Sequence, residues 1–222
     1  MLGLFAPVLI VTLVVTVVAF GIGSIPFGYL IGRAFYRTDI RRSGSGNIGA
    51  MNALRTLGKG GAITVLLLDA AKGAAPVIAI RLALGGTISI ASHVIPTYEV
   101  FASIAAAFAV LGHCLSPWLG WKGGKGVATA VGAIIALSWP AGLVVIGGWI
   151  LGALILTRYS SVGSMLATAV SPFALFFFTR SIPETIFGAF AALFIIYTHR
   201  ENLERLRTGT ENPIPLFSKK AS

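Results

Sequence analysis

Four short segments of the sequence combine arginine, lysine or histidine with glycine, serine and asparagine, which suits them to phosphate binding. Glycine lets backbone N–H groups approach an anion closely, and basic side chains supply the opposite charge. In the first segment, 41–55, a helix starting near Asn47 would direct its amino end toward a phosphate, with Asn52 and Arg55 on one face. The alternative is a flexible loop between helices. The candidate residues are Ser45, Gly46, Asn47, Gly49, Asn52 and Arg55.

The second segment, 121–129, places two lysines among three glycines at the start of an expected short helix. A helix amino end favours negative charge, so a lysine there opposes the macrodipole unless an anion binds. Membrane orientation alone therefore explains these lysines poorly. The candidate residues are Lys122, Gly123, Gly124, Lys125 and Gly126.

The other two segments have simpler alternatives. Segment 158–164 supplies hydroxyl groups, among them Ser161 and Ser164, but many hairpin turns are rich in serine and glycine for conformational reasons. Segment 199–211 continues an apolar stretch as a charged helix. His199 and Asn202 lie three residues apart there, and hence on one face. A solvated amphipathic tail is the alternative for this segment.

Two nucleotide-binding motifs are excluded. Gly44-x-Gly46-x-x-Gly49 matches the dinucleotide fingerprint formally, but that fingerprint requires a preceding strand in a βαβ unit. An apolar helix and four arginines precede it here. Segment 121–129 is not a Walker A loop, because no glycine stands five positions before a Gly-Lys-Ser/Thr ending.

The composition indicates that these segments connect membrane-spanning helices. Charged residues make up 11% of the 222 residues and hydrophobic residues 56%, whereas a soluble domain carries about 25% charged residues. We predict an all-α membrane protein, a single domain over 1–222 and a polytopic bundle of about seven transmembrane helices. The expected spans are 4–32, 62–84, 98–118, 125–137, 140–157, 162–178 and 184–198, with a cytoplasmic carboxyl-terminal tail at 199–222.

Pro140 lies near the centre of a charge-free stretch at 126–157 that is long for one span. Proline lacks the N–H of a continuing helix and clashes with the preceding turn, so we divide the stretch into two helices. The first of these is short enough to cross the membrane only halfway. Merging the two would change the count of seven.

The basic residues predict an orientation. With the amino terminus outside, 14 of the 17 lysines and arginines fall in the inside segments, as the positive-inside rule requires. Inside the membrane, Asp69 and Lys72 lie three residues apart on the second span and are expected to pair, bracing the bundle. His113 is interpreted as a hydrogen-bonded brace. The single cysteine, Cys114, leaves no disulfide, and no metal-ligand cluster is recognisable.

Taken in order, these motifs resemble one family, the bacterial acyl-phosphate:glycerol-3-phosphate acyltransferases (PlsY), from about residue 21 to residue 211. The resemblance rests on Ser45-Gly46-Asn47-x-Gly49-x-x-Asn52-x-x-Arg55, Gly112-His113, Lys122-Gly123-Gly124-Lys125-Gly126, Arg158-Tyr159-Ser160-Ser161-x-Gly163-Ser164 and His199-Arg200-x-Asn202-x-x-Arg205-Leu206-x-x-Gly209-x-Glu211. It implies a seven-helix enzyme of the bacterial inner membrane, with its motifs facing the cytoplasm. The implied reaction moves an acyl group from acyl phosphate to the 1-hydroxyl of glycerol 3-phosphate, giving lysophosphatidic acid.

The resemblance also implies roles for individual residues. The implied phosphate-handling centre comprises Ser45, Arg55, Lys122, Lys125, His199 and Asn202. Gly123, Gly124 and Gly126 are expected to offer backbone donors to acyl phosphate, and Ser161 and Ser164 to contact glycerol 3-phosphate. No cofactor or metal is implied, and a substrate phosphate oxygen could itself accept the hydroxyl proton. Expected partners are the two substrates and membrane lipids, not nucleic acid; whether a soluble enzyme that makes acyl phosphate docks stays open.

Two other classes of protein would also carry glycine-rich loops between apolar helices. A transporter of phosphorylated metabolites can hold anions at half-helices, but it needs access from both sides, and all these loops are expected on one side. It would also show paired repeats of the motifs, which are not visible. A structural membrane subunit would not need four polar, glycine-rich loops.

Overall fold

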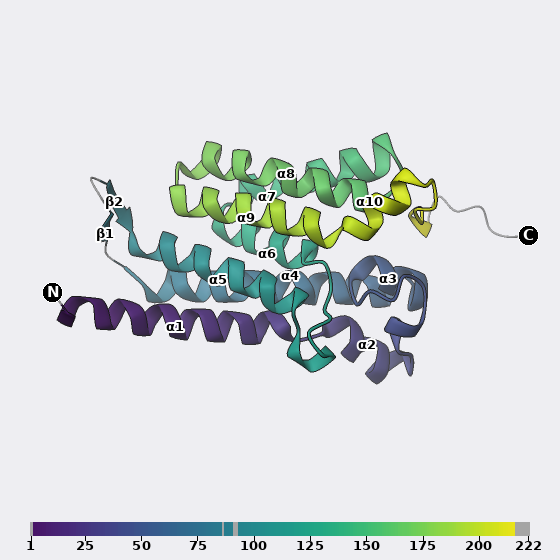
Figure 1. Ribbon diagram of the computed structural model, residues 1–222, viewed down its shortest axis with the longest axis horizontal. Coiled ribbons are helices and arrows are strands. Elements are labelled where there is room, and N and C mark those ends of the chain that lie inside the picture. The colour runs from purple at the N-terminus through teal and green to yellow at the C-terminus, as the bar shows by residue number, and fades with distance from the viewer. Residues whose placement is uncertain (1, 86, 91–92, 216–222) are drawn as a thin grey trace, which may run out of the picture.

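The computed structural model of the protein describes residues 2–85, 87–90 and 93–215. Its long helices lie side by side in an elongated bundle (Figure 1). The helices are α1 (Leu2–Ser24), α2 (Phe27–Tyr36), α3 (Ala50–Thr56), α4 (Gly58–Ala83), α5 (Thr97–Cys114), α6 (Val127–Leu137), α7 (Trp139–Ile150), α8 (Ser160–Thr179), α9 (Ile182–Thr198) and α10 (Arg200–Arg207). There are also two 3₁₀ turns, η1 (Ile40–Arg42) and η2 (Pro117–Leu119), and a π-helix, η3 (Leu151–Leu156), that continues α7.

Five stretches within the described residues are long and apolar enough to cross a membrane, and a sixth results if α9 and α10, bent by 55°, count as one. Helix α6 has only 11 residues, in line with the expected short fourth helix. It ends before Ser138, and Pro140 falls in the first turn of α7, where proline is tolerated. The expected division at this proline is confirmed.

The expected first span, 4–32, falls within one apolar stretch, Pro7–Tyr36, that is long enough to cross a membrane, but this stretch is broken into two helices. Helix α1 ends at Ser24 and α2 begins at Phe27, because Pro26 has no backbone N–H to continue the hydrogen-bond ladder. The carbonyl oxygen of Ile25, freed by this break, accepts a hydrogen bond of 2.8 Å from Lys72 Nζ. A buried lysine of α4 therefore stabilises the break between α1 and α2.

The buried charges pair as expected. Lys72 Nζ lies 2.8 Å from Asp69 Oδ1, and His113 Nδ1 lies 3.6 Å from the same oxygen. All three side chains are buried, so one carboxylate links α4 to the end of α5. Their contacts agree with a bracing role.

Glycines bring α4 and α6 into close contact. A Cβ at Gly73 would lie 2.0 Å from the Thr129 carbonyl oxygen, and a Cβ at Gly132 would lie 2.0 Å from the Ala70 carbonyl oxygen. Small residues let helix backbones approach closely in membrane bundles. This contact fixes the start of α6, and hence the loop that precedes it, against α4.

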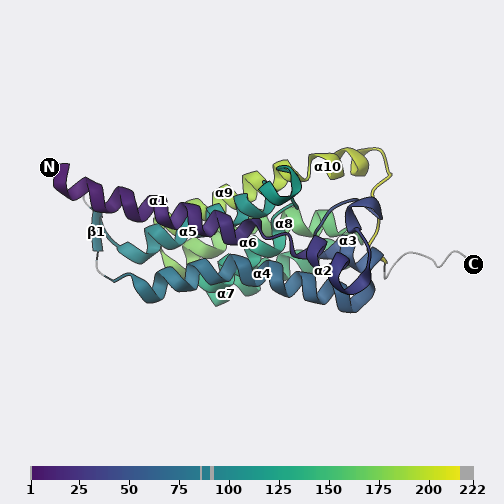
Figure 2. The same ribbon diagram turned by 90° about the horizontal axis from the view of Figure 1, so that it is seen from below.

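Besides the helices, the described residues form two short strands, and the fold remains the expected helical bundle. Strands β1 (Thr87–Ile90) and β2 (His93–Pro96) form an antiparallel hairpin in which Ile88 pairs with Ile95. The hairpin and the amino terminus lie at one end of the bundle (Figure 2). Helices α2, α3 and α10 lie at the other end, where most of the glycine-rich segments are found (Figures 1 and 2).

Candidate functional site

The buried carboxylate of Glu211 connects the tail to α8 and α10. Its Oε1 accepts hydrogen bonds from Asn202 Nδ2 at 2.6 Å and Ser161 Oγ at 2.8 Å. Its Oε2 accepts from Arg205 Nε at 2.7 Å. Burial alone would raise the pKa of Glu211, but these hydrogen bonds outweigh burial and hold the pKa below its usual value. We call Ser161, Asn202, Arg205 and Glu211 the carboxylate network.

Lys125 joins the carboxylate network from the loop before α6. Its Nζ donates a hydrogen bond to Asn202 Oδ1, and its backbone carbonyl accepts one from Thr198 Oγ1 at 3.2 Å. Burial, and next the positive charge of Arg205, lowers the pKa of Lys125 to about 8. Two basic side chains near one carboxylate favour a further anion at this position.

His199 lies at the junction of α9 and α10 and is buried. Its Nδ1 lies 2.8 Å from the Ile195 carbonyl oxygen. Because a carbonyl can only accept, Nδ1 carries the proton and Nε2 is left as an acceptor. Burial, and next the charge of Lys125, lowers the pKa of His199 to about 4. The imidazole is therefore neutral near pH 7.

Arg55 contacts the tail from α3. Its Nη2 donates to the carbonyl oxygens of Pro213 at 3.3 Å and Asn212 at 3.4 Å. The side chain is half-buried and lines a cavity of about 300 Å³ with Leu54 and Pro215. Burial lowers the pKa of Arg55, yet a guanidinium stays charged in proteins. The contacts bring Arg55 to the tail segment that carries Glu211.

Asn52 and Arg55 lie three residues apart on α3, in line with the expected common face, but Asn52 bonds to the preceding loop and Arg55 to the tail. Asn52 Nδ2 donates to the carbonyl oxygens of Asn47, Ile40 and Ser43 at 2.7–3.2 Å, and its Oδ1 accepts from Ser45 N at 2.8 Å. The buried amide thus holds the 40–47 loop together from inside. Helix α3 begins at Ala50, later than expected.

The first glycine-rich loop has the turns that its glycines predict. Gly46 has a φ of +70°, which side chains other than glycine adopt rarely. Asn47 Oδ1 accepts from Gly49 N at 2.9 Å, just before α3. The side chain of Ser45 is exposed at the surface of this loop.

Gly123 and Gly124 were expected to direct their backbone N–H groups at acyl phosphate. In the structure both N–H groups bond to the end of α5 instead. The N–H of Gly123 donates to the Cys114 carbonyl at 2.9 Å, and that of Gly124 donates to the His113 carbonyl at 3.0 Å. A Cβ at Gly124 would lie 2.0 Å from His113 Nε2. These glycines therefore allow the loop to pack on the end of α5. Gly126, with a φ of +85°, precedes α6 as its N-cap.

Lys122 and Ser164 lie outside the hydrogen bonds of the carboxylate network. Lys122 is exposed on the loop before Lys125. Ser164 Oγ donates to the Ser160 carbonyl within α8 at 2.8 Å, whereas Ser161 reaches Glu211. The structure therefore brings together Lys125, His199, Asn202 and Ser161 most closely, and places Arg55 against the tail that completes the group.

A family model described as glycerol-3-phosphate acyltransferase matches residues 13–209. The chain belongs to this family. A protein named glycerol-3-phosphate acyltransferase from Synechococcus sp. (strain JA-2-3B'a(2-13)) is 46% identical over 190 residues, which are 86% of this chain and 88% of the relative. One of the same name from Mesorhizobium japonicum is 43% identical over 193 residues, 87% of this chain and 91% of the relative.

Two solved structures of the acyltransferase PlsY share the fold. Both are described as an integral membrane glycerol 3-phosphate acyltransferase, one in the glycerol 3-phosphate form and one in the lysophosphatidic acid form. The first matches with a TM-score of 0.80 and 33% identity, and the second with 0.78 and 32%; each match covers 93% of this chain and 99% of the other. This PlsY-family chain is therefore a multi-pass membrane protein.

Two residues of the carboxylate network, Glu211 and Arg205, were given no role by the sequence alone. Both stand within the 199–211 motif, but spacing on a helix does not predict that the tail turns back after α10. Ile214 N donates to the Arg158 carbonyl at 3.0 Å, and the Ile214 side chain is buried. This contact holds the tail across the start of α8.

Proposed function

We propose that this PlsY-family protein transfers a fatty acyl group from acyl phosphate to the 1-hydroxyl of glycerol 3-phosphate, forming lysophosphatidic acid. The protein would act as a single domain in the bacterial inner membrane, with about seven spans, its amino terminus outside and the carboxylate network at the cytoplasmic face. The supporting observation is the convergence of Arg55, Lys125, His199 and Asn202 at one end of the bundle.

Acyl phosphate is a mixed anhydride with a good leaving group, so the protein needs to supply mainly positioning and charge stabilisation. In the proposed reaction, O1 of glycerol 3-phosphate bonds to the acyl carbon, the bond from that carbon to the phosphate oxygen breaks, and phosphate leaves. Arg55 and Lys125 would hold the two phosphates, because charge-assisted hydrogen bonds to phosphate are the strong ones. Asn202 would keep the Lys125 ammonium in place.

The hydroxyl proton needs an acceptor. His199 has a pKa of about 4, which makes its Nε2 a weak base at pH 7. A phosphate monoester has its second pKa at about 6, so a substrate phosphate oxygen is the better acceptor. His199 Nε2 would then position glycerol 3-phosphate by accepting a hydrogen bond from its 2-hydroxyl, which leaves the 1-hydroxyl proton to the phosphate.

The other roles follow from the contacts. Asn52 would shape the loop that presents Ser45, and Ser161 would hold Glu211. The glycines at 123 and 124 would seat the loop of Lys125 on His113, and Lys122 would attract anionic substrate to the surface. A transporter is less well supported, because the described basic and polar groups of the carboxylate network all lie at one end.

The direct experiment supplies detergent-purified protein with labelled glycerol 3-phosphate and either palmitoyl phosphate or palmitoyl-CoA. We expect labelled lysophosphatidic acid with palmitoyl phosphate only. Product with palmitoyl-CoA and none with palmitoyl phosphate would contradict acyl phosphate as the donor. Product with neither donor would favour a transporter or a structural subunit.

A further inference from the structure

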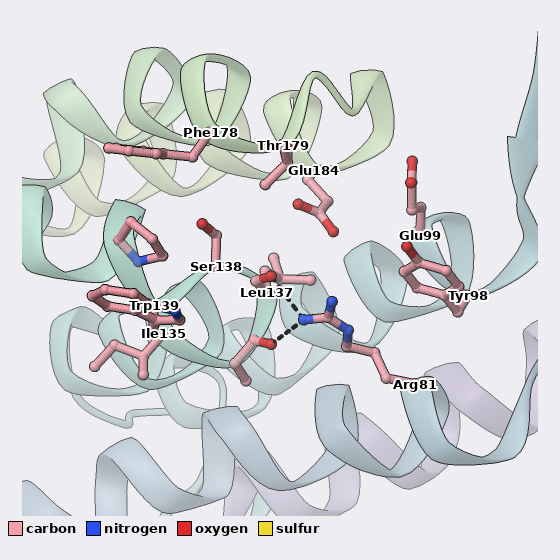
Figure 3. A pocket seen from close by; sticks show the side chains of 12 residues that line it. Arg81, Tyr98, Glu99, Ile135, Leu137, Ser138, Trp139, Phe178, Thr179 and Glu184 are labelled. Atoms are coloured by element: carbon pink, nitrogen blue, oxygen red, sulfur yellow. Dashed lines mark hydrogen bonds between the residues drawn. The ribbon is translucent and has the colours of Figure 1, made fainter.

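A second polar cavity lies at the opposite end of the bundle from the carboxylate network. It has a volume of about 450 Å³, and its polar lining includes Arg81 of α4, Glu99 of α5 and Glu184 of α9 (Figure 3). Fifteen helical residues from Glu184 to His199 correspond to roughly 22 Å. Ligand cavities typically measure about 300–1,000 Å³, so this one is large enough for a site separate from the acyl-transfer chemistry.

Glu184 supplies a buried carboxyl oxygen that still needs a donor. The residue is 3% exposed, and its Oε2 has no hydrogen-bond partner among the described residues. Ser181 and Glu184 have the spacing of a capping box, in which the glutamate would accept from the serine N–H. Here the Ser181 N–H donates to Thr179 Oγ1 at 3.2 Å instead. Helix capping therefore does not account for Oε2.

Arg81 is held in place on the facing side of the cavity. Its Nη1 donates to the carbonyl oxygens of Ala136 and Leu137 at 2.6 and 2.8 Å, and its guanidinium lies 5.5 Å from the centre of the Tyr98 ring. Figure 3 shows the Arg81 guanidinium and the Glu184 carboxylate directed toward the same space. The remaining nitrogens of the fork suit a phosphate, while Oε2 of Glu184 suits a cationic N–H donor.

The rim of the cavity is apolar. Its lining includes three exposed apolar side chains: Trp139 (67% exposed), Phe178 (44%) and Ile135 (40%). Tryptophan is enriched where membrane proteins meet the interface between lipid and water. A ligand carrying a phosphate, an ammonium group and adjoining acyl chains matches these three features.

We propose that this cavity binds the headgroup of a phospholipid with a primary ammonium, of the phosphatidylethanolamine type. The ammonium donates to Glu184 Oε2, the phosphate accepts from Arg81, and the acyl chains lie against Trp139 and Phe178. The proposal does not depend on the acyl-transfer reaction.

The first test needs no variant. The full-length protein is reconstituted in nanodiscs of equimolar phosphatidylethanolamine, phosphatidylcholine and phosphatidylglycerol of equal chain length, and retained lipids are identified by native mass spectrometry. We expect phosphatidylethanolamine to be retained about tenfold over both others, because choline has no N–H donor and glycerol no positive charge. Equal retention of the three lipids overturns the proposal. Loss of retained phosphatidylethanolamine when soluble glycerophosphoethanolamine is added at the same concentration would also overturn it. The cavity would then bind a free metabolite and not a lipid.

Variants test the assignment within the cavity. Glu184→Gln should remove the preference for phosphatidylethanolamine, and Arg81→Gln should weaken all three phospholipids. Glu204→Gln, the same change at a 68% exposed side chain of α10, should leave retention unchanged. An unfolding temperature in detergent equal to that of the wild type shows that Glu184→Gln is folded. A folded Glu184→Gln protein that keeps the wild-type preference overturns the proposal.

Discussion

Lys125 Nζ donates a hydrogen bond to Asn202 Oδ1, joining the loop before α6 to α10 across 77 residues of sequence. The Asn202 amide turns its other side to Glu211, so one side chain links a cation and a carboxylate. The contact joins segment 121–129 to segment 199–211. No local sequence pattern predicts that these two segments lie close together.

Removing either proposed phosphate ligand should stop acyl transfer. We expect Arg55→Ala and Lys125→Ala to lower kcat/KM by about 100-fold or more, the cost of losing one preorganised charge-stabilising group. The measurement is lysophosphatidic acid formation by purified, folded protein. Lys219→Ala and Arg207→Ala, the latter at a 79% exposed side chain, are controls for bulk charge and should be nearly silent. Near-normal turnover in both site variants would contradict the assignment.

The carboxylate of Glu211 should matter for stability as well as activity. Glu211→Gln leaves Arg205 without its charged partner and replaces an acceptor with a donor facing Asn202 or Arg205. A hydrogen bond to a charged group contributes about 1.5–3 kcal/mol, so we expect a loss of about 2 kcal/mol in the free energy of unfolding. Thermal unfolding in detergent measures it, with Glu204→Gln as the matched control. Equal unfolding temperatures for the two variants would argue against the network.

Much of the fold could be predicted from apolar stretches and prolines, because membrane helices need long uncharged segments. The break at Pro140 follows from proline chemistry, whereas the similar break at Pro26 was missed within an uninterrupted apolar run. The hairpin at 87–96 was also missed, since its strands are only four residues each.

The sequence was sufficient to predict most of the residues of the candidate site, but not the contacts between them. Four residues stand out by their type and by their neighbours in the sequence: Arg55, Lys125, His199 and Asn202. Glu211 does not, because its role depends on the tail turning back to α8. Gly123 and Gly124 were expected to bind anions, but a Cβ at either position would collide with His113, which only the folded chain reveals.

Adding a methyl group at Gly124 should disrupt the loop that carries Lys125. A Cβ there would lie 2.0 Å from His113 Nε2, and overpacking of this kind costs about 1–3 kcal/mol. We expect Gly124→Ala to lower both the unfolding temperature and acyl transfer. Gly147→Ala in α7, where a Cβ has no neighbour within 4 Å, is the control. A Gly124→Ala protein with wild-type stability and turnover would show that the contact is unimportant.

The pKa of Lys125 predicts the alkaline limb of activity. This pKa is about 8 in the folded protein against an ordinary value of 10.5, so Lys125 loses its proton as pH rises through 8. We expect kcat/KM to fall about tenfold per pH unit above that value. An arginine stays charged at these pH values. In Lys125→Arg, the fall in the remaining kcat/KM should therefore begin at a higher pH.

The same shift has the opposite effect on stability. The unfolded chain binds the lysine proton more tightly between pH 8 and 10.5, so Lys125 itself makes the fold more stable as pH rises through that window. Deprotonation of Lys125 therefore does not unfold the protein, and a loss of activity between pH 8 and 10.5 would have another cause than unfolding by this residue. A flat pH–rate profile from pH 7 to 9.5 in wild type would contradict a charged Lys125 in the reaction.

The central claim is that the 1-hydroxyl oxygen of glycerol 3-phosphate attacks the acyl carbon of acyl phosphate. Glycerol 3-phosphate labelled with ¹⁸O at that hydroxyl tests it directly, with palmitoyl phosphate as donor and mass spectrometry of both products. We predict that the label is retained in the ester of lysophosphatidic acid and that the released phosphate is unlabelled. Label in the released phosphate, or no lysophosphatidic acid from folded protein, would contradict the proposed reaction.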